Sequence, residues 1–196
     1  MPLFDGNDAA HWAAHYSWAV DGSGNGVDTS MYAARWAQVQ ALGVAASDRI
    51  IVGGAGTGYL VAAAHDAGFP NCWGIDASTQ LTDTPGRFQI ANGVLLVDRP
   101  MQGGGGTLAR LRQLTGDDEF QWVVTEDLLT CYDPSDPDVA DIFAACETVL
   151  AAGEPLTQIV HLVSCDWDPA FIAAPGFSQS LAQWQALAPA HTWLEI

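Results

Sequence analysis

The chain has 196 residues, 49% of them hydrophobic, which is typical of one globular domain with a continuous core rather than of a disordered chain. Its 23 acidic residues stand against only 6 basic ones, all arginine, and the net charge of -17 repels nucleic acid phosphates and anionic membranes. Nucleic acid binding is therefore disfavoured. The start, MPLFDGNDAA, lacks the basic and apolar parts of a signal peptide, and no apolar run is long enough to span a membrane.

The aromatic-rich segment 1–27 is interrupted by glycine and asparagine, and we interpret it as an N-terminal flap. His11 and His15 are four residues apart and would share one face of a helix, as metal ligands can. Trp12 occupies the place of the glutamate in an HExxH motif, however. We therefore predict no metal site, and expect the flap to pack on the core or to cover a ligand.

A first helix is expected over residues 29–42, closed by the glycine that follows. Met31, Ala34, Val39 and Leu42 recur near helical spacing and mark its expected apolar side.

Short apolar runs then alternate with helical segments along the rest of the chain. The expected strands are 49–52, 72–76, 94–97, 121–125, 158–163 and 192–196. The expected further helices are 59–67, 107–114, 138–151 and 178–187. This alternation predicts a single α/β domain over 1–196, a Rossmann-like three-layer α/β/α sandwich with a mostly parallel sheet.

The cysteines are far apart and form no CxxC pair: Cys72, Cys131, Cys146 and Cys165. This spacing predicts buried thiols in a reducing compartment rather than a disulfide framework or a zinc site. We therefore expect a cytoplasmic protein.

A glycine-rich turn follows the first strand and opens the next helix. It comprises Gly54, Ala55, Gly56, Thr57 and Gly58. Such a turn lets the backbone approach a ligand closely and directs a helix N-terminus at it. Asp76 ends the second strand about twenty residues later, where an acid can accept hydrogen bonds from ribose hydroxyls. The combination predicts a nucleotide-like cofactor.

The glycine spacing distinguishes between cofactors. A dinucleotide fingerprint, GxGxxG, needs its third glycine where Tyr59 or Val61 stands, and either side chain would obstruct close packing. The pattern present is GxGxG, from Gly54 to Gly58. With this loop and Asp76, the chain resembles the class I S-adenosylmethionine-dependent methyltransferases over about residues 48–165.

This resemblance implies a cofactor, S-adenosyl-L-methionine, and a methyl acceptor that is a small molecule or a protein. Besides the loop, it implies cofactor contacts from Asp76 with its neighbour Ala77, and from Asp98 at the end of the third strand. Glu126 and Asp127 fall where the family places its fourth-strand motif, beside the methyl group. The alternative is a catalytically inactive domain of the same fold, serving in binding or assembly.

Two features depart from the family. Val52 stands where the family has an acid that helps to hold the methionine amino group, so another group holds it or cofactor binding is weak. The family sheet also ends in a sixth strand and an antiparallel seventh, for which the chain is too short. We therefore expect a C-terminally shortened sheet, whose edge a partner chain could complete.

The candidate catalytic residues are Glu126 and Asp127, which could accept a proton or contact the methionine end. A solvent-facing acid pair at the start of a loop is an equally weighted interpretation. The Asn/Asp-Pro-Pro-Tyr signature for nucleobase amino groups is absent there, which disfavours DNA methylation. His161, within an apolar strand, is expected to be a core residue with satisfied hydrogen bonds. Residues 165–168 follow that strand as pocket lining or as an ordinary loop.

Overall fold

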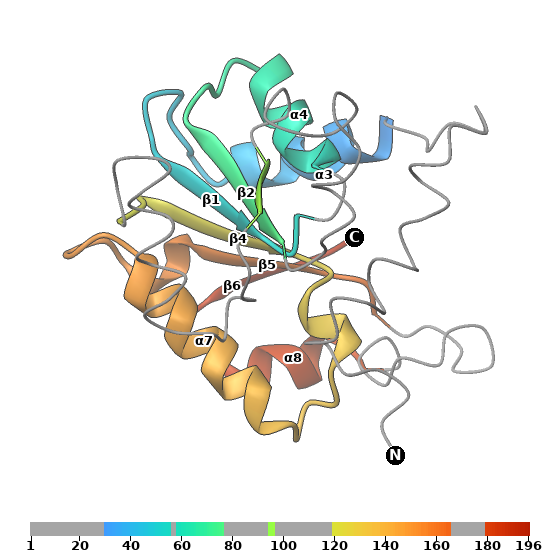
Figure 1. The fold of residues 1–196 in the computed structure, drawn as a ribbon. Coiled ribbons are helices and arrows are strands. Elements are labelled where there is room, and N and C mark those ends of the chain that lie inside the picture. Colours follow the sequence, from blue (N-terminus) through green and yellow to red (C-terminus); the bar gives the residue numbers. More distant parts are fainter. Residues whose placement is uncertain (1–29, 56–57, 77–93, 97–118, 166–178) are drawn as a thin grey trace.

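The computed structural model describes residues 30–55, 58–76, 94–96, 119–165 and 179–196 (Figure 1). Six strands form one sheet in the order β3-β2-β1-β4-β5-β6, and every neighbouring pair is parallel. The strands are β1 (Ile50–Gly53), β2 (Cys72–Asp76), β3 (Val94–Leu96), β4 (Trp122–Glu126), β5 (Ile159–Val163) and β6 (Thr192–Glu195). The helices are α3 (Ser30–Gln40), α4 (Tyr59–Asp66), α7 (Pro137–Val149) and α8 (Leu181–Leu187).

Helices cover both faces of the sheet: α3 and α4 lie on one side, α7 and α8 on the other (Figure 1). Strands β1, β4 and β5 are buried along their whole length, which is why they read as continuous apolar runs. Successive side chains along each strand point to opposite faces of the sheet and therefore pack into two different cores. In β1, Ile51 belongs to the core under α7 and α8, whereas Ile50 and Val52 belong to the core under α3 and α4.

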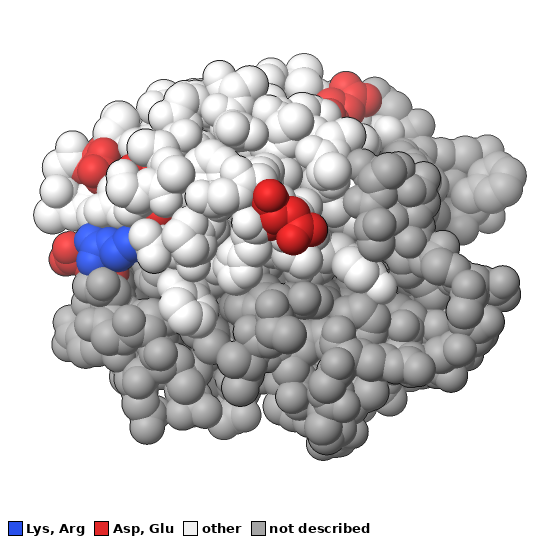
Figure 2. Space-filling view, turned by 90° about the horizontal axis from the view of Figure 1, so that it is seen from above, with Lys and Arg blue, Asp and Glu red and all other residues white. Residues whose placement is uncertain are grey.

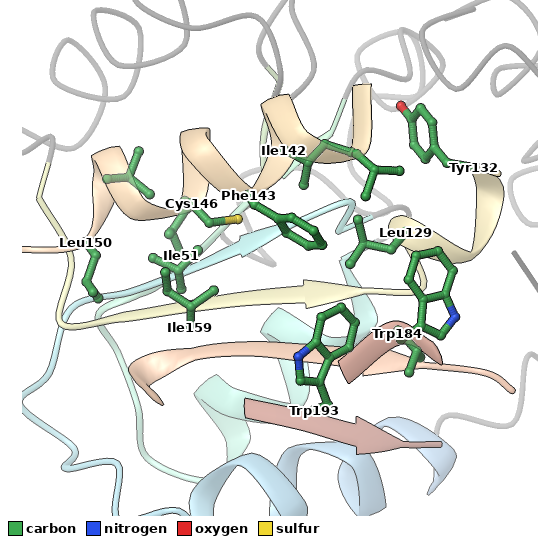
Figure 3. Packing of buried hydrophobic residues seen from close by; sticks show 14 of the residues in the cluster. Ile51, Leu129, Tyr132, Ile142, Phe143, Cys146, Leu150, Ile159, Trp184 and Trp193 are labelled. Atoms are coloured by element: carbon green, nitrogen blue, oxygen red, sulfur yellow. The ribbon is translucent and has the colours of Figure 1, made fainter. Parts of the chain in front are cut away.

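The core on the α7 side is the more aromatic of the two, and Figure 3 shows part of it. Asp136 caps the N-terminus of helix α7: its side chain accepts a hydrogen bond from the Asp138 amide, and Pro137 is the first residue of the helix. Its buried residues recur at helical spacing: Val139, Ile142, Phe143, Cys146 and Val149. One apolar stripe therefore faces the sheet, where the rings of Trp184 and Trp193 stack with centroids 6.1 Å apart.

On α3, the predicted apolar side is largely wrong. Met31, Ala34 and Leu42 are exposed, whereas Trp36 is 1% exposed and Val39 is fully buried. The helix turns the stripe through Trp36 and Val39 inward, because burial of the large indole removes more apolar surface from water than burial of the smaller side chains. The same orientation of α3 brings the side chain of Arg35 to the end of β4.

The predicted fold class is confirmed. The predicted strands, and the helices that fall on described residues, have observed counterparts whose ends coincide or differ by at most three residues. Two short 3-10 helices, Leu129–Cys131 and Leu156–Gln158, were not predicted. The predicted helix 107–114 and flap 1–27 lie outside the described residues. Of the helices described, none is long and apolar enough to cross a membrane.

The C-terminal edge of the sheet is formed by β6, which pairs directly with β5 and runs parallel to it. Across the described residues, all strand pairs are parallel, so the sheet carries no antiparallel strand in that part of the chain. The order β3-β2-β1-β4-β5-β6 is also the order of the doubly wound dinucleotide-binding sheets.

Candidate functional site

The carboxyl ends of β1 and β4 meet at the point where the order of the sheet reverses. Chain order runs outward from β1 through β2 to β3 on one side, and from β4 through β5 to β6 on the other. In open α/β sheets, ligands bind in the crevice outside the strand ends at this switch point. The glycine turn follows β1 at this point; beside it, Glu126 ends β4 and Asp127 comes directly after the strand.

The glycine turn is held tightly against the end of β4. Gly54 has φ 71°, a left-handed conformation that favours glycine. A Cβ atom built on Gly54 would lie 2.9 Å from the Leu128 Cβ and 3.3 Å from the Glu126 carbonyl oxygen. Glycine is therefore required here both by the backbone conformation and by the closeness of the two chains.

The turn continues into α4. The Ala55 amide donates to the Ile75 carbonyl at 3.1 Å, which ties the turn to β2. Gly58 has φ 81°, is buried, and forms the N-cap of α4. The described part of the loop is thus a strand-to-helix turn that brings backbone, rather than side chains, to the switch point.

Glu126 is a buried carboxylate with a cationic partner. Its Oε1 accepts a hydrogen bond of 2.7 Å from Nη1 of Arg35 on α3, and the two side chains are only 7% and 13% exposed. Burial raises the pKa of Glu126 to about 7, because it penalises the charged form more than the Arg35 hydrogen bond and charge favour it. The neighbouring charge of Asp127 raises the pKa further. Glu126 can therefore exchange a proton near neutral pH.

Asp127 has a different role from its neighbour. It is the one non-glycine residue of the described chain with positive φ, 47°. Its Oδ1 accepts from the Ser164 amide at 2.9 Å, and its own amide donates to the Leu162 carbonyl at 2.9 Å. These bonds fix the corner after β4 to the end of β5. Arg35 Nη2 lies 3.6 Å from Oδ2, so the same guanidinium contacts both acids.

Burial also raises the pKa of Asp127, while the Arg35 charge and the bonds from Ser164 lower it. Of the two acids predicted as a catalytic pair, Glu126 is the more deeply buried, and Asp127 bonds the backbone at the end of β5.

Two tyrosines border the cluster of charged groups. The rings of Tyr32 on α3 and Tyr59 on α4 are 5.3 Å apart, and the Arg35 guanidinium carbon lies 5.4 Å from the Tyr32 ring centroid. Burial, with the charge of Glu126, raises the pKa of Tyr32 to about 12. Tyr32 is therefore a neutral phenol that lines the site and supports Arg35.

Charge is spread thinly over the described part of the face that α3 and α4 cover. Figure 2, which views the molecule from that side, shows scattered acidic side chains there, with basic side-chain atoms beside acidic ones at one edge. The net charge of -17 is thus not concentrated into one acidic patch on the described part of this face.

The predicted site residues divide into three groups. Those brought together at the ends of β1 and β4 are Gly54, Ala55, Gly58, Glu126 and Asp127. Asp76 is the last residue of β2, the strand that pairs with β1, and so ends at the same edge of the sheet. The remaining predicted residues lie outside the described part of the chain: Gly56, Thr57, Ala77 and Asp98.

Sequence reasoning missed Arg35, Tyr32 and Ser164. A signal existed for Arg35, since two adjacent acids at the end of a buried strand need a cation, and the chain has only 6 basic residues. The sequence did not show which side of α3 faces the sheet, so it could not show that Arg35 reaches these acids. Tyr32 and Ser164 carried no comparable signal.

Comparison of the chain with models of known protein families and with curated proteins finds no match. The geometry itself therefore defines the site: a backbone turn packed on a strand end, a buried carboxyl group that titrates near neutrality, and a permanently cationic guanidinium beside it.

Proposed function

We propose that the protein is an S-adenosylmethionine-dependent methyltransferase acting on a small-molecule or protein acceptor. The observation that carries the proposal is the contact of Gly54 with the end of β4, which places a left-handed glycine turn beside buried Glu126 at the switch point. The GxGxG spacing and the position of Asp76 at the end of β2 support this cofactor over others. The cofactor would supply an activated methyl group.

The chain's own residues have separable roles in this proposal. The turn from Gly54 to Gly58 presents backbone groups to the cofactor, and Asp76 binds its ribose. Glu126 takes the proton that an acceptor hydroxyl or amine releases, for which its pKa of about 7 is suited. Arg35 orients the Glu126 carboxylate that accepts this proton, and Glu126 is then the neutral acid.

Isothermal titration with S-adenosylmethionine and S-adenosylhomocysteine tests the proposal. We expect both to bind, and expect Asp76→Ala to weaken binding by at least about tenfold through the lost ribose hydrogen bonds. Asp66→Ala is the matched control, because Asp66 is an exposed acid at the far end of α4. Absence of binding of either compound to the wild-type protein at millimolar concentration would refute the cofactor assignment.

Val52 favours a second candidate, a catalytically inactive domain of the same fold that serves in binding or assembly. Its side chain is fully buried in the core under α3 and α4, so it offers no charge to an amino group. Incubation of a lysate with the protein and methyl-labelled cofactor separates the two candidates. Transfer of label to any acceptor eliminates the inactive domain, whereas binding without transfer supports it.

The strand order favours a third candidate, a dinucleotide-dependent oxidoreductase, because doubly wound dinucleotide-binding sheets have the same order. Tyr59 at the start of α4 counts against it, since a glycine is needed there for close packing. Titration with a nicotinamide dinucleotide in the same calorimetric series would favour this candidate if only that ligand bound.

We place the protein in the cytoplasm. The thiols of Cys72 and Cys146 are buried and reduced, and burial raises the pKa of each, which makes them unreactive. Buried reduced thiols are typical of reducing compartments. Fractionation of the source cells, with the protein followed by an antibody, tests this placement.

A further inference from the structure

A continuous row of hydrogen bonds runs through the core on the opposite face of the sheet from the candidate site. The Thr125 hydroxyl lies 2.8 Å from Nδ1 of His161, and Nε2 of His161 lies 3.0 Å from Nδ1 of His191. Nε2 of His191 lies 3.4 Å from Oε1 of Glu147. We call these four residues the histidine chain; they come from β4, β5, the segment before β6, and α7.

The row leads from the middle of the sheet to the surface. Thr125 and His161 are fully buried and His191 is 7% exposed, whereas the Glu147 side chain is half exposed. Neighbouring strands align the inner members, since Thr125 pairs with His161 in the register of β4 and β5. The histidine chain therefore meets water chiefly at Glu147.

With both rings neutral, one arrangement of protons satisfies every bond. The Glu147 carboxylate can only accept, so His191 donates from Nε2 and its Nδ1 accepts. His161 must then donate from Nε2, which leaves its Nδ1 to accept from the Thr125 hydroxyl. In the neutral pair, both rings therefore carry their proton on Nε2. An additional proton would place a full positive charge inside this core.

The surroundings of the rings are apolar. Phe143 of α7 lies 5.4 Å from the His161 ring and 5.6 Å from the His191 ring, and Trp193 of β6 lies 4.4 Å from the His161 ring. Burial lowers the pKa of His161 well below its usual value, and lowers that of His191 despite the opposing effect of Glu147.

Few titratable groups face the rings within the described residues. Helix α7 contributes Glu147 and the buried thiol of Cys146, whose pKa burial raises to about 12. Strand β4 contributes only the Thr125 hydroxyl, while β6 and α8 contribute tryptophans to this core. Among the described residues, Glu147 is thus the charged neighbour of the His161–His191 pair.

We propose that the histidine chain is an acid-sensitive lock that holds α7 on the sheet while both rings are neutral and releases it at mildly acidic pH. A proton added to either ring places a positive charge between the sheet and α7, where His161 is fully buried and Phe143 and Trp193 pack against the rings. The half-exposed Glu147 carboxylate offsets part of this desolvation cost, and separation of α7, which exposes the rings to water, removes the rest. Protonation therefore favours states in which α7 has separated from β5 and β6.

The direction of the effect follows from linkage. The unfolded chain binds protons below the ordinary histidine pKa of 6.5, while the folded pair resists them. The stability that the neutral pair contributes is full above pH 6.5 and is lost as the pH falls below it.

Native-state hydrogen exchange of the α7 amides measures this release. We expect the opening equilibrium of α7, corrected for intrinsic exchange, to rise by about tenfold or more between roughly pH 7.5 and pH 5.5 in the wild-type protein. In the double variant His161→Phe/His191→Phe, the phenyl rings fill the core and cannot titrate, so we expect no rise in the opening equilibrium of α7. His65→Gln is the matched control and should keep the wild-type response, since His65 lies on α4 and contacts the Cys72 carbonyl.

The protonation state of the wild-type rings provides a second test, which stands even if the double variant fails to fold. Nitrogen-15 NMR of the imidazoles should show both rings neutral with Nε2–H at roughly pH 7.5, above the ordinary histidine pKa. Observation of an Nδ1–H ring or of a charged ring at that pH would overturn the proposal. Equal α7 protection at both pH values in the wild-type protein would also overturn it.

Discussion

Polar side chains are buried on both faces of the sheet, but they are stabilised in different ways. On the α3 and α4 side, Arg35, Glu126 and Asp127 form a charged cluster at the strand ends, with part of Asp127 exposed. On the α7 and α8 side, Thr125 and His161 lie in the middle of the core and are neutral. Charges thus lie at the edge of the sheet and uncharged donors and acceptors in its centre, as desolvation costs require.

The two clusters have opposite linkage to protons. The pKa of Glu126 is raised, so its contribution to stability is full below pH 4.5 and is lost as the pH rises through about 7. The pKa of the His161–His191 pair is lowered, so its contribution is lost as the pH falls below 6.5. A nearly flat overall pH dependence would therefore hide two opposing effects, and variants are needed to separate them.

The largest effect is expected from Arg35→Met, which removes the cation from the charged side only. It leaves Glu126 and Asp127 without their shared guanidinium, and breaking a buried pair costs about 4 kcal/mol. Urea unfolding at roughly pH 8 measures the loss, which should shrink near pH 5 as Glu126 becomes protonated. Adding Glu126→Gln should recover part of the stability; full additivity of the two changes would show that the residues do not interact.

Gly54→Ala should have the next largest effect. The new Cβ meets the Leu128 Cβ at 2.9 Å in a left-handed conformation, and strain and overpacking together cost about 3 kcal/mol. Gly43→Ala is the matched control: it has φ 99° but nothing within 4 Å, so it tests backbone strain alone. Equal losses of unfolding free energy in the two variants would mean that the close approach of the turn to β4 contributes nothing.

Glu126→Gln isolates the proton linkage of the charged side. Because the amide that replaces the carboxyl group cannot titrate, the stability of the variant relative to wild type should rise by about 2 kcal/mol between roughly pH 5 and pH 8. The opposite slope of the histidine chain is common to both proteins and cancels in the difference. Parallel curves of unfolding free energy against pH would contradict the raised pKa of Glu126.

Thr125→Val is expected to have the smallest effect and examines the neutral side. It keeps the β-branched shape and leaves Nδ1 of His161 without its donor, at a cost of about 1 kcal/mol. Thr148→Val is the control, because Thr148 bonds the Ala144 carbonyl on the exposed side of α7. Similar values for the two variants in urea unfolding would show that the buried hydroxyl adds no more than a surface one.

The prediction from sequence was best where the cause is local. Strand and helix limits follow from apolar periodicity, glycines and caps, and all of these act within a few residues. His161 was predicted to be a satisfied core residue, and this is confirmed by its two hydrogen bonds. The same logic failed on α3, where two alternative apolar stripes compete and only contact with the sheet chooses between them.

The alternation of strands and helices, the acids at the end of β4 and the glycine turn after β1 were determined by the sequence itself, because each is encoded by neighbouring residues. The partners of those residues were decided by the tertiary structure. Arg35 and Glu126 are 91 positions apart, and His161 and His191 are 30 apart. Their meeting depends on strand order and helix phase, which are set by packing of the whole core rather than by local sequence.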